Sequence, residues 1–95
     1  MTSSDIPHLV DLLADCRRRA EPLDSHIAAV LSFAGEQAAG TEERVSRGGG
    51  CNSLITYICD ALTRARQGGL PQDLLADIAR AHELATALAR RLGVL

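Results

Sequence analysis

The sequence predicts an all-α fold, a compact bundle of four main helices to which short turns in the loops would add a fifth or sixth helical segment. Apolar residues recur every three or four positions along most of the chain, as on one face of an amphipathic helix. Aromatic residues make up only 2% of the 95 residues, so the core must consist of Leu, Ile, Val and Ala, which suits close-packed helices. No segment alternates apolar and polar residues for long enough to predict a strand. The length is that of a single domain, residues 1–95.

The first helix is predicted over residues 5–20. Ser4 or Asp5 can cap its start, and Pro7 lies in the first turn, where proline is tolerated. Its apolar face consists of Ile6, Leu9, Val10, Leu13 and Cys16. The three arginines at 17–19 are then predicted to lie at a helix C-terminus, where cations complement the helix dipole. The alternative interpretation of these arginines is a phosphate-binding site.

A second helix is predicted over residues 23–39, after a break at Glu21-Pro22. Its apolar face consists of Leu23, Ile27, Val30, Ala34 and Ala38, with Leu31 beside them. Gly35 and Gly40 should loosen its end. His26 flanks the apolar face, where we expect it to be partly buried.

Residues 40–52 are predicted to form a flexible, glycine-rich loop. Thr41 with the two glutamates after it could start a single helical turn, and Val45 could anchor that turn in the core. The three glycines 48–50 have a second interpretation, an anion-binding nest before the next helix. A phosphate loop would also need a strand before it and a lysine within it, and the sequence supplies neither.

The third helix, residues 53–67, carries the most apolar helical stripe, so we expect it to be central in the bundle. The stripe consists of Leu54, Ile58, Ala61 and Ala65, widened by Ile55 and Leu62. Asn52 or Ser53 can cap its start. Gly68-Gly69 ends it, and Pro71 prevents its continuation.

The last helix is predicted over residues 71–92, antiparallel to the third because the connection is short. Its seam, at heptad spacing, consists of Leu74, Ile78, Ala81, Ala85, Leu88 and Leu92. Such a seam fits packing within the chain and homodimerisation equally well. His8 and His82 lie off the apolar stripes, where we expect solvent.

The residue types exclude several kinds of chemistry. All ten basic residues are Arg, so there is no lysine for a phosphate loop, a Schiff base or general-base catalysis. The net charge of −2 argues against a nucleic-acid surface. The three histidines and three cysteines lack the paired short spacings of a metal site. We therefore expect neither catalytic residues, nor a cofactor, nor a bound metal.

The cysteine content predicts a cytoplasmic protein with free thiols, since Cys16, Cys51 and Cys59 are odd in number and no apolar signal segment begins the chain. Cys51, in the glycine loop, is expected to be the most exposed. No stretch of about 18 apolar residues predicts a membrane span.

Three segments, taken in order, resemble a known family. They are Leu9-Val10-Asp11-Leu12-Leu13, then Val45-Ser46-Arg47 with the apolar residues of the third helix, and finally Gly68-Gly69-Leu70 with Leu74-Leu75. Their order is similar to that in the effector-associated domains of bacterial conflict and signalling proteins, which are small death-domain-like helical adaptors. The resemblance covers nearly the whole chain, with linkers a residue or so longer and Gln67 where a proline often stands.

This resemblance implies a non-catalytic module that binds protein partners, by packing like domains together, and so recruits an effector such as a protease or an ATPase. We expect a monomer or a homodimer whose partner is a helical domain. The arginines that we expect to steer association are Arg44, Arg47, Arg64 and Arg66.

An alternative resemblance involves residues 23–92. Gly50-Cys51-Asn52-Ser53-Leu54 is similar to the phosphopantetheine site of acyl and peptidyl carrier domains, with Asn in place of Asp. It implies that Ser53 carries a 4′-phosphopantetheine arm. The other interpretation of Ser53 is an ordinary helix cap. The helix at 5–20 has no place in a carrier domain.

Overall fold

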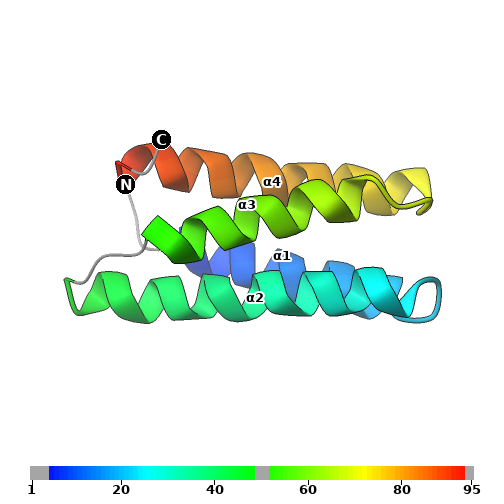
Figure 1. Cartoon of the computed structure of the whole chain (residues 1–95), viewed down its shortest axis with the longest axis horizontal. Coiled ribbons are helices and arrows are strands. Elements are labelled where there is room, and N and C mark those ends of the chain that lie inside the picture. The colour runs from blue at the N-terminus through cyan, green and yellow to red at the C-terminus, as the bar shows by residue number, and fades with distance from the viewer. Residues whose placement is uncertain (1–4, 49–51, 94–95) are drawn as a thin grey trace.

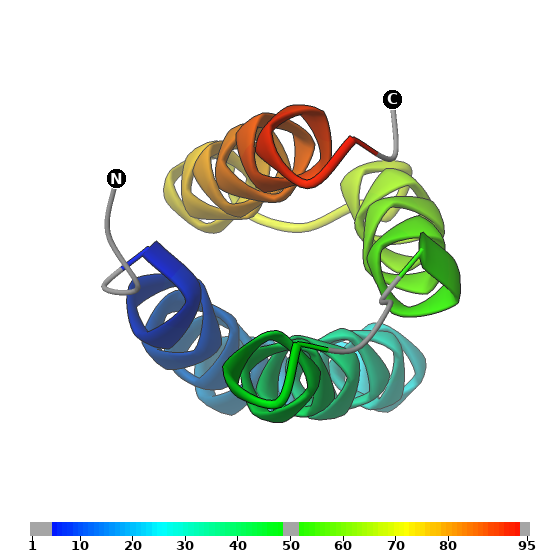
Figure 2. The ribbon, with the colours of Figure 1, turned by 90° about the vertical axis from the view of Figure 1, so that its left-hand side faces the viewer.

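The computed structural model describes residues 5–48 and 52–93, which form four helices packed as a bundle (Figure 1). The helices are α1 (Asp5–Ala20), α2 (Ser25–Ser46), α3 (Asn52–Arg66) and α4 (Gln72–Arg91). Successive helices run in opposite directions along the long axis. Seen from the end, they stand at four corners, where α1 and α3 each pack between α2 and α4 (Figure 2). The predicted all-α bundle of four helices is confirmed.

The interior is aliphatic and contains many small side chains. Its largest fully buried residues are Leu9, Leu13, Leu31, Ile55, Ile58, Leu62, Leu74 and Ile78. Buried alanines occur on every helix, among them Ala20, Ala34, Ala65 and Ala85, and they let neighbouring helices approach closely. The third helix contributes to the core as predicted, but it occupies one corner of the bundle rather than its centre.

Three of the helices, α1, α3 and α4, begin and end within one residue of their predicted bounds. Pro71 is the N-cap of α4, so the proline stands just before the helix it starts. Gly68 and Gly69 separate α3 from α4 as predicted. Before α2, Asp24 caps the helix, and its carboxylate accepts hydrogen bonds from the backbone N–H groups of His26 and Ile27 at 3.0 and 3.2 Å.

The predicted loop at 40–52 is wrong over its first seven residues, because α2 continues to Ser46. A glycine inside a helix costs only about 1 kcal/mol relative to alanine, so Gly40 does not end it. Thr41 is fully buried one turn beyond Ala38, the last buried alanine of α2. Its hydroxyl donates a hydrogen bond to the backbone carbonyl of Gln37 at 2.8 Å. The helix ends at Ser46 with Arg47 as its C-cap, and Gly48 follows with a φ of +74°, a conformation that favours glycine.

Two apolar residues of this region lie elsewhere than predicted. Leu23 precedes α2 and is 57% exposed, so it does not belong to the buried face. Val45 is 39% exposed and is not a core anchor. The capping role of Ser4 and the exposure of Cys51 lie outside the described residues, as does most of the predicted glycine nest, at Gly49 and Gly50.

The heptad seam of α4 packs within the chain. Leu74, Ile78, Ala81, Ala85 and Leu88 are buried against the other helices, with Leu92 partly buried beside them. Of the two interpretations that the sequence left open, intrachain packing is therefore correct for this face. No described helix is both long enough and apolar enough to cross a membrane.

Candidate protein-interaction site

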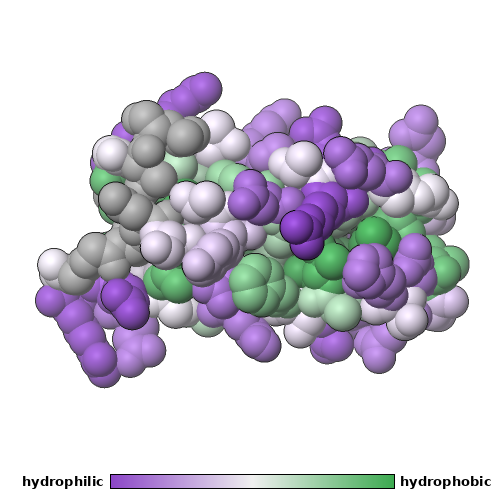
Figure 3. Space-filling model, viewed as in Figure 1, coloured by the Kyte–Doolittle hydropathy of each residue, from purple (hydrophilic) through white to green (hydrophobic). Residues whose placement is uncertain are grey.

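A groove of about 490 Å³ lies between α2 and α3. Its lining residues are His26, Ala29, Val30 and Phe33 on α2 and Tyr57, Asp60, Ala61 and Arg64 on α3. Figure 3 shows hydrophobic residues gathered along the boundary of these two helices, in the lower right half of the view, with hydrophilic residues on both sides. We call this feature the α2–α3 groove.

The chain contains only two aromatic residues, Phe33 and Tyr57, and both lie in this groove. They are 43% and 49% exposed. Their ring centroids lie 6.0 Å apart with an angle of 56° between the ring planes, a favourable tilted arrangement. The largest apolar side chains of the protein therefore contribute to its surface, while aliphatic residues fill its core.

Three ionisable side chains border the rings. His26 lies at the start of α2 and is exposed, so the prediction of partial burial is wrong. Asp60 and Arg64 are exposed one turn apart on α3, a spacing that often yields an ion pair. Within residues 5–48 and 52–93, neither of them forms one, so both charges face solvent beside the rings.

The four arginines predicted to steer association do not form one surface. Arg44 and Arg47 lie at the end of α2, whereas Arg64 and Arg66 lie at the end of α3. Since these helices are antiparallel, the two pairs stand at opposite ends of the bundle. Arg47 pairs with Glu43 at 2.8 Å, and only Arg64 lines the groove.

Arg66 instead contacts a histidine of α4. Its guanidinium lies 3.1 Å from Nδ1 of His82. His82 is partly buried, so the prediction that it is solvated is wrong, whereas His8 is exposed as predicted. Burial, followed by the charge of Arg66, lowers the pKa of His82 below its usual value. The imidazole therefore stays neutral at neutral pH and can accept a hydrogen bond from Arg66.

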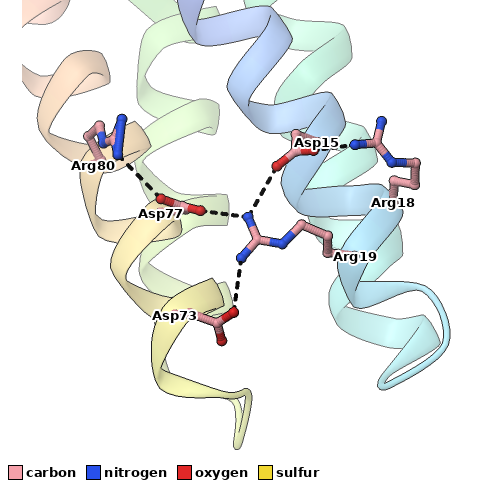
Figure 4. A network of polar contacts seen from close by, with 6 residues as sticks. All are labelled: Asp15, Arg18, Arg19, Asp73, Asp77 and Arg80. Atoms are coloured by element: carbon pink, nitrogen blue, oxygen red, sulfur yellow. Dashed lines mark hydrogen bonds and ion pairs between the residues drawn. The ribbon is translucent and has the colours of Figure 1, made fainter.

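The basic cluster at the end of α1 is engaged with carboxylates (Figure 4). Arg19 reaches across to α4, where it pairs with Asp77 at 2.5 Å and with Asp73 at 3.6 Å. It also pairs with Asp15 on its own helix at 3.1 Å, and Arg18 contacts the same carboxylate. The hydrogen bond from Arg19 lowers the pKa of Asp77.

This network links the first helix to the last. The basic residues occupy the last turn of α1, and Asp73 lies in the first turn of α4, so each charge also complements a helix dipole. The interpretation of residues 17–19 as a helix C-terminus is therefore confirmed. With several carboxylates around Arg19, this surface is unsuited to binding phosphate.

The two described cysteines are free thiols that face the core. Burial, with a contribution from the negative charge of Asp77, raises the pKa of Cys16 to about 11. Burial also raises the pKa of Cys59. Both thiols are therefore protonated at neutral pH and are poor nucleophiles. In the part of the chain that the structure describes, no three His, Cys, Asp or Glu side chains come together as a metal site.

Ser53, the alternative modification site, is exposed in the first turn of α3. Residues 23–92 supply only three of the four helices. The fourth, α1, contributes Leu9, Leu13 and Cys16 to the core, so a carrier unit of residues 23–92 would leave this core open.

Sequence reasoning did not find the groove. The exposure of Phe33 and the position of Tyr57 beside it depend on how α2 packs on α3, which no local pattern reports. The one signal available was the position of both aromatic residues outside the apolar stripes. Comparison of the chain with protein families, with curated proteins and with solved structures gives no match.

Proposed function

We propose that this chain is a non-catalytic protein-interaction module that docks a helical domain of its own kind through the α2–α3 groove. The observation that carries the proposal is the exposed pair Phe33 and Tyr57, in a protein whose described buried apolar residues are Leu, Ile, Ala and Cys. Exposed aromatic rings on rigid helices are favoured centres of binding energy, because a partner that covers them removes a large apolar area from water.

The resemblance to effector-associated domains supports the same proposal and extends it. Like-with-like docking of such domains would recruit an effector in bacterial signalling or defence. We place the module in the cytoplasm, since the thiols of Cys16 and Cys59 are unpaired and a reducing compartment would keep them so.

Sedimentation velocity over about 5–500 μM protein tests the proposal, because this range covers dissociation constants from roughly micromolar to nearly millimolar, as expected for weak reversible association. The wild-type chain should dimerise as its concentration rises, and the double variant Phe33→Ser/Tyr57→Ser should remain a monomer. Val45→Ser is the matched control, since Val45 is an exposed apolar residue of α2 outside the groove. Circular dichroism verifies that each variant is folded. A wild-type chain that stays monomeric throughout, or a double variant that dimerises equally well, would refute the proposal.

A phosphopantetheine carrier is the second candidate, which the exposure of Ser53 at the start of α3 favours. Incubation with coenzyme A and a promiscuous phosphopantetheinyl transferase, followed by mass spectrometry, tests it. A mass gain of one prosthetic arm that is lost in Ser53→Ala would support the carrier function, and an unchanged mass would contradict it.

A further inference from the structure

The register between α2 and α3 follows from two close approaches. A Cβ atom on Gly40 would lie 3.7 Å from Cδ1 of Leu54, and one on Gly68 would lie 3.1 Å from Cδ1 of Ile27. Positions 40 and 54 therefore lie at one level along the bundle, and positions 27 and 68 at another. Since both helices rise about 1.5 Å per residue, Phe33 lies level with about residues 61–62 of α3.

Two opposite charges on α3 lie on either side of this level. Asp60 and Arg64 are exposed, and both line the α2–α3 groove. They lie about 6 Å apart along the helix axis, centred on residue 62. Among the residues that the structure describes, neither has an ion-pair partner, although their spacing would permit a pair with each other. The groove therefore carries Phe33 at its middle, with an acid and a base at equal distances to either side.

This charge pattern distinguishes between two ways of docking a second copy. When two copies meet face to face, their two-fold axis lies in the plane of contact, and with the helices aligned it runs either along the groove or across it. An axis along the groove would set α2 of each copy on α3 of the other. Arg64 would then lie level with about Val30, and Asp60 with about Ala34, so neither charge would meet its opposite.

An axis across the groove sets each helix antiparallel on its own counterpart. With this axis at the level of residue 62, Asp60 of each copy lies opposite Arg64 of the other, because both positions are two residues from the axis. Phe33 lies within about 1.5 Å of the axis level, so it meets its own counterpart, and aromatic pairs pack favourably. The small side chain of Ala61, which also lines the groove near this level, allows the two copies of α3 to approach closely.

We infer that two copies of this chain dock through their α2–α3 grooves about an axis across the groove, with Phe33 against its counterpart and Asp60 of each copy paired with Arg64 of the other. The inference rests on the proposed function and specifies its contacts. Charge complementarity identifies the occupant as a second copy, because a self-complementary surface needs its acid and base equally spaced from the axis. The same operation covers the exposed ring of Phe33 and pairs both charges twice.

Charge reversal at this contact provides the test. Asp60→Arg would place two arginines against each other at both charge contacts, and Arg64→Asp would place two aspartates there. Each variant alone should therefore dimerise at least about tenfold more weakly than the wild type. An equimolar mixture should recover dimers, and so should the double variant Asp60→Arg/Arg64→Asp alone, since each arginine then meets an aspartate again. Glu83→Arg is the control, because Glu83 is exposed on α4 and does not line the groove.

Sedimentation velocity of these samples, with circular dichroism to verify folding, separates the outcomes. Weak dimers of each single variant, with recovery in both the mixture and the double variant, would support the inferred contact. Single variants that dimerise like the wild type, failure of the mixture or the double variant to recover, or an equal loss of dimers in Glu83→Arg would overturn it. In those cases the module proposal stands if Phe33→Ser/Tyr57→Ser still abolishes dimers, and falls if that variant dimerises normally.

Discussion

Replacing Gly40 with alanine is expected to stabilise the fold, because this glycine lies inside a helix that does not require it. Gly40 is in the interior of α2, and its φ is not among the positive values found at Gly48 and Gly93. Alanine can adopt the same backbone conformation without strain. It also loses less conformational entropy than glycine when the helix forms.

The magnitude follows from two terms. The difference in helix propensity between glycine and alanine is about 1 kcal/mol. The added methyl group would lie 3.7 Å from Cδ1 of Leu54, which is ordinary van der Waals contact and adds a small favourable contribution. We therefore expect Gly40→Ala to raise the free energy of unfolding by about 1 kcal/mol, and the melting temperature by roughly 4–8 °C for a domain of this size.

Thermal unfolding followed by circular dichroism measures the change, with two other glycines as controls. Gly68→Ala should gain little or lose stability, because its Cβ would lie only 3.1 and 3.2 Å from side-chain atoms of Ile27. Gly48→Ala should be destabilising, since Gly48 has a φ of +74°. A lower melting temperature for Gly40→Ala would refute the reasoning, because it would mean that position 40 needs a conformation that only glycine adopts and that α2 is interrupted there.

Three further predictions concern titratable groups. The pKa of His82 is lower in the folded state, so the contribution of neutral His82 to stability is complete above about pH 6.5 and declines as the pH falls below that value. Arg66→Gln should raise the pKa of His82 in an NMR titration, and an unchanged pKa would contradict a contribution from Arg66. The pKa of Asp77 is also lower in the folded state, so the contribution of its carboxylate to stability is complete above the usual pKa of an aspartate and is lost as the pH falls through the lower folded value. Arg19→Gln should raise the pKa of Asp77, and an unchanged pKa would argue against the α1–α4 ion pair. Cys16 is fully buried with a pKa of about 11, so it should react with a thiol reagent at pH 8 only when the helix bundle unfolds locally or globally. Mass spectrometry measures the labelling, and rapid labelling of Cys16 in the native protein would contradict this prediction.

Local signals were sufficient to predict most of the fold. Proline and glycine act on the backbone at their own positions, so Pro71 and Gly68 predicted the boundary between α3 and α4 within one residue. Gly40 was misleading because its unfavourable helix propensity is small. The burial of Thr41 and the pairing of Glu43 with Arg47 outweigh it, and the former depends on tertiary packing.

The candidate site was less accessible to sequence reasoning. The charge of Arg64 predicts it as an interaction residue, and Arg64 does line the groove, but the sequence analysis does not predict Phe33 and Tyr57 as site residues. They lie 24 positions apart on different helices, and their contact exists only once α2 and α3 pack. A predicted set of arginines likewise could not reveal that two lie at each end of the bundle.

The pairing of Arg19 with α4 joins the beginning of the chain to its end, so the helices form a closed cycle in which each has two neighbours. Since α1 and α4 are antiparallel, Asp5 and Arg91 lie at the same end of the bundle (Figure 1). The stability of the fold should therefore depend more on the packing of each helix against its two neighbours than on the order of the helices in the sequence. A circular permutant that begins at α3, with a short linker from α4 to α1, should fold around the same core.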